Sequence, residues 1–243
     1  MSEYLIRKLE NGSDLIDDDR AFLREATKRT KDLRARQAII DEGDEPKDVH
    51  VVVEGFACRY KILTDGSRQI MALLVPGDFC DLHVAILGAM DHGIATLSPC
   101  RIALLPRSTV EEITYDYPRL ARAMWWATLV DEATLREWLA NMGQRDAADR
   151  LAHLFCELYV RLRSVGLTQD HAFDLPMKQT DLAETLGMTP VHMNRSIQHL
   201  RAANLLEFRS GRVHLPDFER LQKQCGFTPN YLHLKSNHAP SLL

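Results

Sequence analysis

The side chains best suited to recognising another molecule lie close together near the carboxyl end of the chain. Between Thr189 and Arg201 the sequence holds histidine, asparagine, glutamine and arginine side chains, and no acidic residue. Donors of these types on the outer face of a helix can reach base edges in the major groove of DNA. The donors that we expect on that face are His192, Asn194, Arg195, Gln198, His199 and Arg201.

Two short helices around a turn would position these donors. Gly187 can take the positive φ of a tight turn. Thr189 is a natural N-cap, and Pro190 suits the first helical position, where its missing N–H costs nothing. The apolar residues that we expect to face the core are Leu182, Ala183, Leu186, Met193, Ile197 and Leu200. This order predicts a helix-turn-helix, with an ordinary helical hairpin inside a larger domain as the alternative.

A hairpin follows the two helices. Leu205–Phe208 and Arg212–Leu215 have the composition of short strands, and Arg209-Ser210-Gly211 forms a tight turn between them. Helix, turn, helix and hairpin in this order predict a winged helix. Arg209 and Arg212 would then lie near a phosphate backbone. The alternative for these two arginines is a solvated hairpin without a ligand.

The composition is that of an ordinary globular protein. The chain has 243 residues, is 45% hydrophobic and 26% charged, and carries a net charge of −4. Residues 171–225 hold seven Lys and Arg against six Asp and Glu, so charge alone favours DNA only weakly. Five scattered cysteines, with no signal peptide and no long apolar run, predict a reduced cytoplasmic protein without a membrane partner.

The first half of the chain has the texture of a small β-domain. Residues 1–35 have a mostly helical pattern, and short runs rich in β-formers follow it, separated by Gly and Pro turn signals. The expected strands are Val49–Val53, Phe56–Leu63, Gln69–Val75 and Ile94–Leu105. Strands at this spacing predict a β-sandwich or a small barrel.

A long helix is expected from Pro118 to Met142. At 25 residues it would be roughly 37 Å long. Its apolar band is wider than one sandwich face needs, which favours a dimer interface; packing on its own β-domain is the alternative. The interface residues that we expect are Leu120, Met124, Ala127, Val130, Leu135 and Trp138.

The breaks in these patterns define four segments. We expect a β-roll over 1–116, a dimerisation helix over 117–145, a winged helix-turn-helix domain over 146–225, and a poorly ordered tail over 226–243. A short hinge at Arg145-Asp146 joins the second and third segments, and Asp146 can cap the helix that follows.

Over residues 10–225 this order resembles the Crp/Fnr family of bacterial transcription regulators. The most specific matches are Pro76-Gly77-Asp78-Phe79 and the segment from Gln179 to Arg195, which contains the pattern TPVHxNR. The resemblance implies an α+β fold, with a cyclic-nucleotide-binding-like β-roll (a double-stranded β-helix), a long dimerisation helix and a winged helix-turn-helix. It also implies a homodimer that regulates transcription on a palindromic double-stranded DNA operator, in contact with RNA polymerase if it activates.

The resemblance assigns roles to individual residues of the helix-turn-helix. Arg195 matches the arginine that reads a guanine, and Thr189 matches a phosphate-contacting hydroxyl. The full set of expected DNA contacts is Gln179, Thr180, Thr189, Pro190, His192, Asn194, Arg195, Gln198, Arg209 and Arg212. The sequence departs from the family at Val191, where a base-reading Glu is usual, so we expect a different half-site from TGTGA or TTGAT.

The family's cyclic-nucleotide site is incomplete in this sequence. Its acid position falls at Leu82, or at Asp81 if the loop shifts by one, and no Arg or Lys lies between Asp78 and Arg101. Without a cation, a buried phosphate would be badly stabilised. We therefore expect a regulator that does not depend on cAMP.

The same loop is where an effector pocket is expected. Its residues are Asp78, Phe79, Cys80, Asp81, Leu82, His83 and His92. Cys80 and His83 resemble the haem-ligating region of the family's carbon-monoxide-sensing branch, and Cys80, His83, His92 and Cys100 could alternatively gather around a metal or act as redox thiols. We expect no cofactor, with these haem-, metal- or redox-sensing roles as the alternative. Residues 1–57 hold no cysteine, which excludes the iron–sulfur branch.

An enzyme is not expected. Cupin-type β-domains hold their metal with an HxH pair, and neither His83 nor His50 has a histidine two residues away. The sequence also lacks a nucleophile elbow, a P-loop and a GxGxxG motif.

Overall fold

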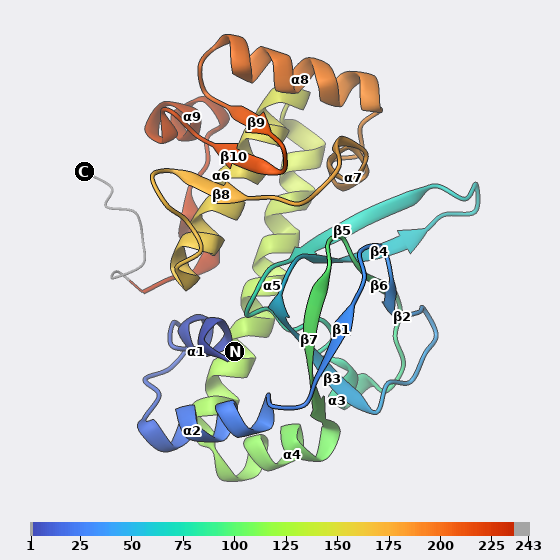
Figure 1. Ribbon diagram of the computed structural model, residues 1–243, viewed down its shortest axis with the longest axis vertical. Coiled ribbons are helices and arrows are strands. Elements are labelled where there is room, and N and C mark those ends of the chain that lie inside the picture. Colours follow the sequence, from blue (N-terminus) through green and yellow to red (C-terminus); the bar gives the residue numbers. More distant parts are fainter. Residues whose placement is uncertain (1, 236–243) are drawn as a thin grey trace. The chain divides into compact units, whose positions relative to one another are not determined.

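The structure is a computed structural model that describes residues 2–235 and divides into two compact units (Figure 1). Within these described residues, unit 1 consists of 2–62 and 71–131, and unit 2 of 63–70 and 132–235. One continuous helix, α5 (Pro118–Gln144), contributes its first half to unit 1 and its second half to unit 2. This helix begins at the proline predicted to open it and continues through Gly143.

Unit 1 is a β-roll with helices before and after it. The helices besides α5 are α1 (Glu3–Leu9), α2 (Asp17–Ala26), α3 (Val84–Leu87) and α4 (Arg107–Asp116). The strands are β1 (Thr30–Leu33), β2 (Ala38–Ile40), β3 (Asp48–Glu54), β4 (Ala57–Ile62), β5 (Arg68–Leu74), β6 (Gly93–Thr96) and β7 (Cys100–Pro106). They form two antiparallel-paired sheets, in the orders β1-β7-β3 and β2-β6-β4-β5.

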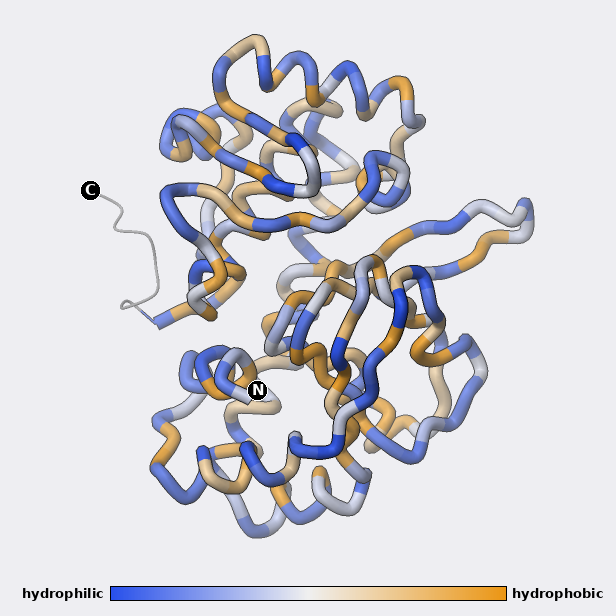
Figure 2. Tube along the Cα trace, viewed as in Figure 1, coloured by the Kyte–Doolittle hydropathy of each residue, from blue (hydrophilic) through white to orange (hydrophobic). Residues whose placement is uncertain are grey.

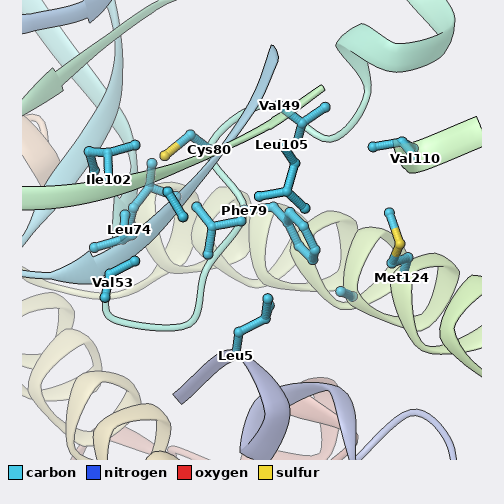
Figure 3. Packing of buried hydrophobic residues seen from close by; sticks show 14 of the residues in the cluster. Leu5, Val49, Val53, Leu74, Phe79, Cys80, Ile102, Leu105, Val110 and Met124 are labelled. Atoms are coloured by element: carbon cyan, nitrogen blue, oxygen red, sulfur yellow. The ribbon is translucent and has the colours of Figure 1, made fainter. Parts of the chain in front are cut away.

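The core of unit 1 is a single cluster of apolar side chains. Strands β3, β5 and β7 contribute to it, as do α1, α4 and α5. Figure 3 shows Val49, Leu74, Leu105, Leu5, Val110 and Met124 from these six elements meeting around Phe79. In β3 the valines Val51, Val52 and Val53 are buried in succession, and the register with β7 shifts between Val52 and Glu54.

The predicted strand Ile94–Leu105 is wrong as one element. The chain turns between Thr96 and Cys100, so the two ends of the run become β6 and β7 in different sheets. Leu97 and Ser98 donate their N–H groups to Phe56 O at 2.7 and 3.2 Å, which holds the turn. The signal for this turn is Ser98-Pro99 inside the run, which the prediction of one strand passed over, because Ser-Pro favours a turn and proline cannot donate to a strand ladder.

Unit 2 is built around α6 (Ala147–Val165). Asp146 caps this helix as predicted, because its Oδ1 accepts from Ala148 N and Asp149 N at 2.9 Å. The other elements are β8 (Ala172–Asp174), α7 (Gln179–Thr185), α8 (Pro190–Ala202), β9 (Glu207–Arg209), β10 (Arg212–His214), α9 (Phe218–Cys225) and the 3₁₀ helix η1 (Pro229–Leu232). Both α8 and α9 pack on α6. Among the described residues, none of the helices has the length and apolar character needed to cross a bilayer.

The prediction of a poorly ordered tail from Phe227 is wrong as far as residue 235; residues 236–243 lie outside the described part. Phe227, Tyr231 and Leu232 are buried. Tyr231 donates its hydroxyl to Glu157 Oε2 at 2.9 Å, and Trp138 Nε1 donates to the same oxygen. Burial raises the pKa of Glu157, and these donors, together with Arg161, oppose that rise. The segment is ordered because it completes the shell around a buried carboxyl group.

His153 of α6 lies beneath the same segment. Phe227 meets its ring edge-on at 5.0 Å and Tyr231 stacks on it at 6.1 Å. Its Nε2 lies 3.1 Å from Glu137 Oε1 without hydrogen-bond alignment, so neither ring nitrogen has a hydrogen-bond partner. Burial, together with repulsion from Arg145, lowers the pKa of His153 to about 3.

Unit 2 should therefore lose stability in mild acid. Between pH 6.5 and 3 the unfolded chain binds a proton at His153 that the folded chain does not bind, so stability falls as the pH is lowered through this window. From pH 7.5 to 5, His153 should contribute a loss of about 2 kcal/mol in the free energy of unfolding. Urea unfolding followed by circular dichroism at the two pH values measures the loss.

His153→Leu should reduce this pH-dependent loss, because it removes the group that binds the proton. Glu137 keeps a partner in the variant, since it forms an ion pair with Arg145 at 3.0 Å. His199→Leu is the control, since His199 is exposed on α8. Equal pH dependence in His153→Leu and the wild type would contradict the assignment.

Candidate nucleic-acid interface

The turn between α7 and α8 depends on Gly187. Its φ is +60°, in the left-handed region that glycine adopts at little cost. A Cβ at this position would lie 3.2 Å from Cε of Met142. The amide of Met188 then donates to Ala183 O at 2.9 Å, which closes the end of α7. Gly187 thus lets the chain reverse between the helices, as the sequence predicts.

The first turn of α8 is capped as expected. Thr189 Oγ1 accepts from His192 N at 3.3 Å, and Pro190 occupies the first helical position. Three apolar side chains fix the rotation of the helix about its axis, because Met193, Ile197 and Leu200 are fully buried. This rotation determines which residues of α8 face solvent.

The outer face of α8 is polar and contains no acid. Figure 2 shows hydrophilic and hydrophobic residues alternating around the helix. All ten residues predicted to contact DNA are exposed: Gln179, Thr180, Thr189, Pro190, His192, Asn194, Arg195, Gln198, Arg209 and Arg212. Val191, at the position where the departure from the family was noted, is also exposed, at 60%. Their contacts with DNA remain predictions.

Arg195 is an uncommitted cation. Among residues 2–235 its side chain has no hydrogen-bond or ion-pair partner in the structure. The two acids of α7 are different, because Asp181 and Glu184 both pair with Arg68, at 2.9 and 2.6 Å. Arg68 is part of the segment Leu63–Ile70 that belongs to unit 2. The charge of Arg195 is therefore available to an external anion or acceptor.

The hairpin after α8 differs in detail from the prediction. Arg209 is the last residue of β9, and the turn consists of Ser210 and Gly211, which both have positive φ, as a type I′ turn requires. A third strand, β8, pairs with β10 and was not predicted, because its three residues carry no clear pattern. Arg212 pairs with Asp174 of β8 at 3.2 Å, while Arg209 remains exposed at the end of the hairpin.

The prediction of dimer-interface residues on α5 is wrong for all but one of them, because five of the six are buried within the chain. Leu120, Met124, Ala127 and Val130 are buried in the chain itself, and Trp138 donates to the buried Glu157. Only Leu135 of the predicted set is exposed. The large apolar side chains that α5 does expose, here called the α5 stripe, are Trp125, Leu129, Leu135, Leu139 and Met142. The apolar band of α5 is wider than one packing face because it includes both the core-facing and the exposed apolar side chains.

The predicted effector pocket is largely occupied by the protein's own contacts. Asp78 pairs with Lys8 at 2.6 Å. Asp81 is fully buried and accepts from both the backbone N and the Nδ1 of His50, at 2.6 and 2.7 Å. Figure 3 shows Phe79 and Cys80 inside the apolar cluster. Burial raises the pKa of the Cys80 thiol well above its usual value, so Cys80 is a protonated core residue.

Arg59 is a half-buried cation in this region that was not predicted from the sequence. It donates to Cys80 O at 2.8 Å, to Phe79 O at 2.9 Å and to Asp131 Oδ2 at 2.9 Å. The loop sequence between Asp78 and Arg101 contains no Arg or Lys, whereas Arg59 reaches the loop from β4. Its guanidinium is committed to these partners, so it does not supply the missing phosphate contact.

The structure brings two of the predicted pocket residues, His83 and His92, together with Asp91. One ligand atom from each lies within 4.8 Å of the others. Burial lowers the pKa of both histidines, and Arg59 adds to the effect, whereas Asp91 opposes it. Leu82 is half-buried, and neither Cys80 nor Cys100 belongs to this group.

Comparisons with known proteins match both halves of the chain. A model of the cyclic nucleotide-binding domain matches residues 30–117, and a model of the Crp-like helix-turn-helix domain matches residues 149–224. The chain is 27% identical over 206 residues to the transcriptional activator protein FnrL of Cereibacter sphaeroides, across 83% of this chain and 82% of that protein. It is 26% identical to the nitrogen fixation regulation protein FixK of Azorhizobium caulinodans, across 73% and 71%.

The fold has a solved counterpart. The structure of FixK2 from Bradyrhizobium japonicum superposes with a TM-score of 0.72 at 25% identity, across 80% of this chain and 95% of that one. The predicted fold class, a cyclic-nucleotide-binding-like roll with a carboxyl-terminal helix-turn-helix, is confirmed by these matches.

A pair of glycine substitutions tests the turn. Gly187→Ala should lower the free energy of unfolding by about 1 kcal/mol, because alanine is strained at positive φ. Gly143→Ala, within α5, should raise it by up to about 0.5 kcal/mol, since its Cβ would meet nothing within 4 Å. Urea unfolding measures both changes. The free energy of unfolding of Gly187→Asn should fall between those of the wild type and Gly187→Ala. Equal free energies of unfolding for the wild type, Gly187→Ala and Gly187→Asn would show that the turn does not need a left-handed residue.

Proposed function

Because the chain belongs to the Crp/Fnr family of transcription regulators, we propose that it acts as a homodimer on a palindromic operator. Its relatives are regulators of transcription and not enzymes, and its helix-turn-helix binds DNA. In the proposed complex each copy inserts α8 into a major groove, and the two half-sites lie about one helical turn, ~34 Å, apart. The cytoplasm, where the DNA is, is the proposed location.

One observation carries the DNA-binding mode. Met193, Ile197 and Leu200 anchor α8 from below, while its outer face exposes Arg195 without a partner among the described residues. An arginine held in this way can donate two parallel hydrogen bonds to O6 and N7 of guanine. Thr189 and the positive end of the α8 dipole would contact a phosphate.

Val191 supports a half-site that differs from the common ones. Its side chain is apolar and exposed in the first turn of α8, so it cannot accept a hydrogen bond from a cytosine amino group. An apolar side chain in the major groove instead favours the methyl group of thymine. We therefore expect a thymine where the family's Glu would select a cytosine.

Binding without cAMP is supported by the contacts in the roll. Asp81, the acid nearest to the ribose-binding position, already accepts two hydrogen bonds from His50. Arg59, the half-buried arginine of this region, is held by Asp131 and two backbone carbonyls. A cyclic nucleotide would have to break these contacts to obtain an acid and a cation, so the ligand-free protein is the proposed DNA-binding form.

The α5 stripe is the proposed dimer interface. Trp125 and Leu139 are 69% and 75% exposed, and their spacing of two heptads places them on one face of a continuous helix. Glu132 and Arg136, which lie between Trp125 and Leu139 in the sequence, form an ion pair with each other at 2.7 Å. A second copy of the same helix complements such a stripe, because a two-fold interface brings the same residues together from both chains. If the protein activates transcription, as FnrL does by name, RNA polymerase is its further partner.

The DNA-binding proposal is tested by selection from a random double-stranded DNA pool, with purified protein and no small molecule. We expect enrichment of a palindrome. On the enriched site, Arg195→Ala should lose about 1–3 kcal/mol of binding free energy and relax the preference at one base pair per half-site. Fluorescence anisotropy at fixed salt measures the affinity.

Arg34→Ala is the matched control, because Arg34 is exposed in unit 1 and its removal changes the net charge equally. Equal losses on cognate and scrambled DNA in Arg195→Ala would contradict base reading. Enrichment only after cAMP is added would contradict binding by the ligand-free protein.

Leu139→Glu should convert the dimer to a monomer, since two buried carboxylates would face each other across the two-fold axis. Analytical ultracentrifugation of wild type and variant measures the mass. Tyr115→Glu, at an 83% exposed side chain of α4, is the control and should remain dimeric. A monomeric wild type, or a dimeric Leu139→Glu, would exclude the α5 stripe as the interface.

A further inference from the structure

Two histidines of unit 1 face each other although nine positions separate them in the sequence. His83 directly precedes α3, and His92 directly precedes β6. Their ring centroids lie 5.4 Å apart with an interplanar angle of 35°. His92 is buried, at 8% exposure, and His83 is half-buried. Neither residue belongs to the core cluster or to the proposed DNA and dimer surfaces.

Both rings leave a nitrogen without a partner. The Nε2 atoms of His83 and His92 are buried and have no hydrogen-bond partner among residues 2–235. Buried polar atoms in folded proteins nearly always have a partner, because leaving one unsatisfied costs about 1–3 kcal/mol. Two such atoms at neighbouring rings therefore indicate a ligand that binds both.

Asp91 determines which form of the His92 ring is present. Its Oδ1 lies 2.6 Å from His92 Nδ1. A carboxylate only accepts, so the proton of the neutral ring is on Nδ1 and the lone pair is on Nε2. A carboxylate that orients one nitrogen while the other carries a free lone pair is the arrangement found around histidines that ligate metals.

We propose that Nε2 of His83 and Nε2 of His92 bind one divalent first-row transition-metal ion, with Asp91 as the carboxylate that orients His92. Two imidazoles and a nearby carboxylate suit zinc, cobalt, nickel or copper and not calcium or magnesium, which prefer oxygen ligands. Water or a small anion completes the coordination. This proposed site differs from the expectation that the chain holds no cofactor. It does not depend on the proposed DNA binding.

The surrounding charges are compatible with a cation. Arg59 and Lys61 are the cations whose charge acts on these rings. Each has its own acid, since Arg59 pairs with Asp131 at 2.9 Å and Lys61 pairs with Glu42. Asp91 and Asp81 provide negative charge near His83. One ligand atom from each of His83, Asp91 and His92 lies within 4.8 Å of the others, so side-chain movements on the order of 1 Å suffice to bring ligands to metal–nitrogen bonds of about 2.0–2.1 Å.

The test uses full-length protein freed of metal by a chelator and dialysis. Co²⁺ titration followed by its visible d–d absorbance, and Zn²⁺ titration followed by calorimetry, should each show one ion per chain. His83→Ala, His92→Ala and the double variant should weaken binding by more than about 100-fold, and Asp91→Asn by about 10–100-fold. Circular dichroism of each variant establishes that it is folded.

His199→Ala is the matched control, because His199 is exposed on α8 in unit 2. This variant should bind Co²⁺ with the affinity of the wild type. The wild-type titration stands without any variant, so loss of folding in a variant does not protect the proposal. Absence of Co²⁺ and Zn²⁺ binding to the wild type would overturn it. Wild-type affinity in the folded double variant, or a thiolate-to-cobalt charge-transfer band, would also overturn it.

Discussion

The rotation of α8 about its own axis is the constraint on which DNA recognition by this chain depends. Met193, Ile197 and Leu200 have no exposed surface, so a turn of the helix by one residue would bring polar side chains into the core. The capped first turn at Thr189 and the left-handed Gly187 fix where the helix starts. A small set of apolar contacts therefore decides which side chains face a groove, although none of these apolar residues can touch a base.

The roll shows the opposite organisation, because its charged groups are turned inward toward one another. Asp81 binds His50, Asp78 binds Lys8 and Arg59 binds Asp131. Each pair joins parts of unit 1 that are far apart in sequence, so the charges act as fixed links in the fold. Removing Lys8 or His50 would leave the carboxylate of Asp78 or Asp81 buried and uncompensated. The groups that a nucleotide would need are thus structural here. Among the described residues of unit 1, the buried side-chain nitrogens without a hydrogen-bond partner are Nε2 of His83, Nε2 of His92 and Nε of Arg107.

Short-range chemistry made much of this fold predictable from the sequence. Pro118 begins α5, Asp146 caps α6 and Thr189 caps α8, because each signal acts within one helical turn. Features that depend on distant partners were missed. Arg59 reaches Phe79 and Cys80 from another strand, and Tyr231 orders the last described segment only because Glu157 lies beneath it. The width of an apolar band, likewise, does not say which of its side chains pack on their own chain. The side-chain contacts of the proposed DNA surface stay predictions.

The charge count of the DNA-binding segment understates its local field. Residues 171–225 have nearly equal numbers of acids and bases, yet the acids closest to α7 and the hairpin are committed to pairs: Asp174 with Arg212, Glu207 with His214, and Asp181 and Glu184 with Arg68. Arg195 has no acid partner among the described residues, so its full charge is available to an external anion. Acids held in ion pairs also repel a phosphate less than free acids do. Of the seven Lys and Arg in residues 171–225, only Arg212 forms an ion pair with an acid among the described residues, so most cations of this segment can attract the phosphate backbone. Base contacts made by α8 would add selectivity to that attraction.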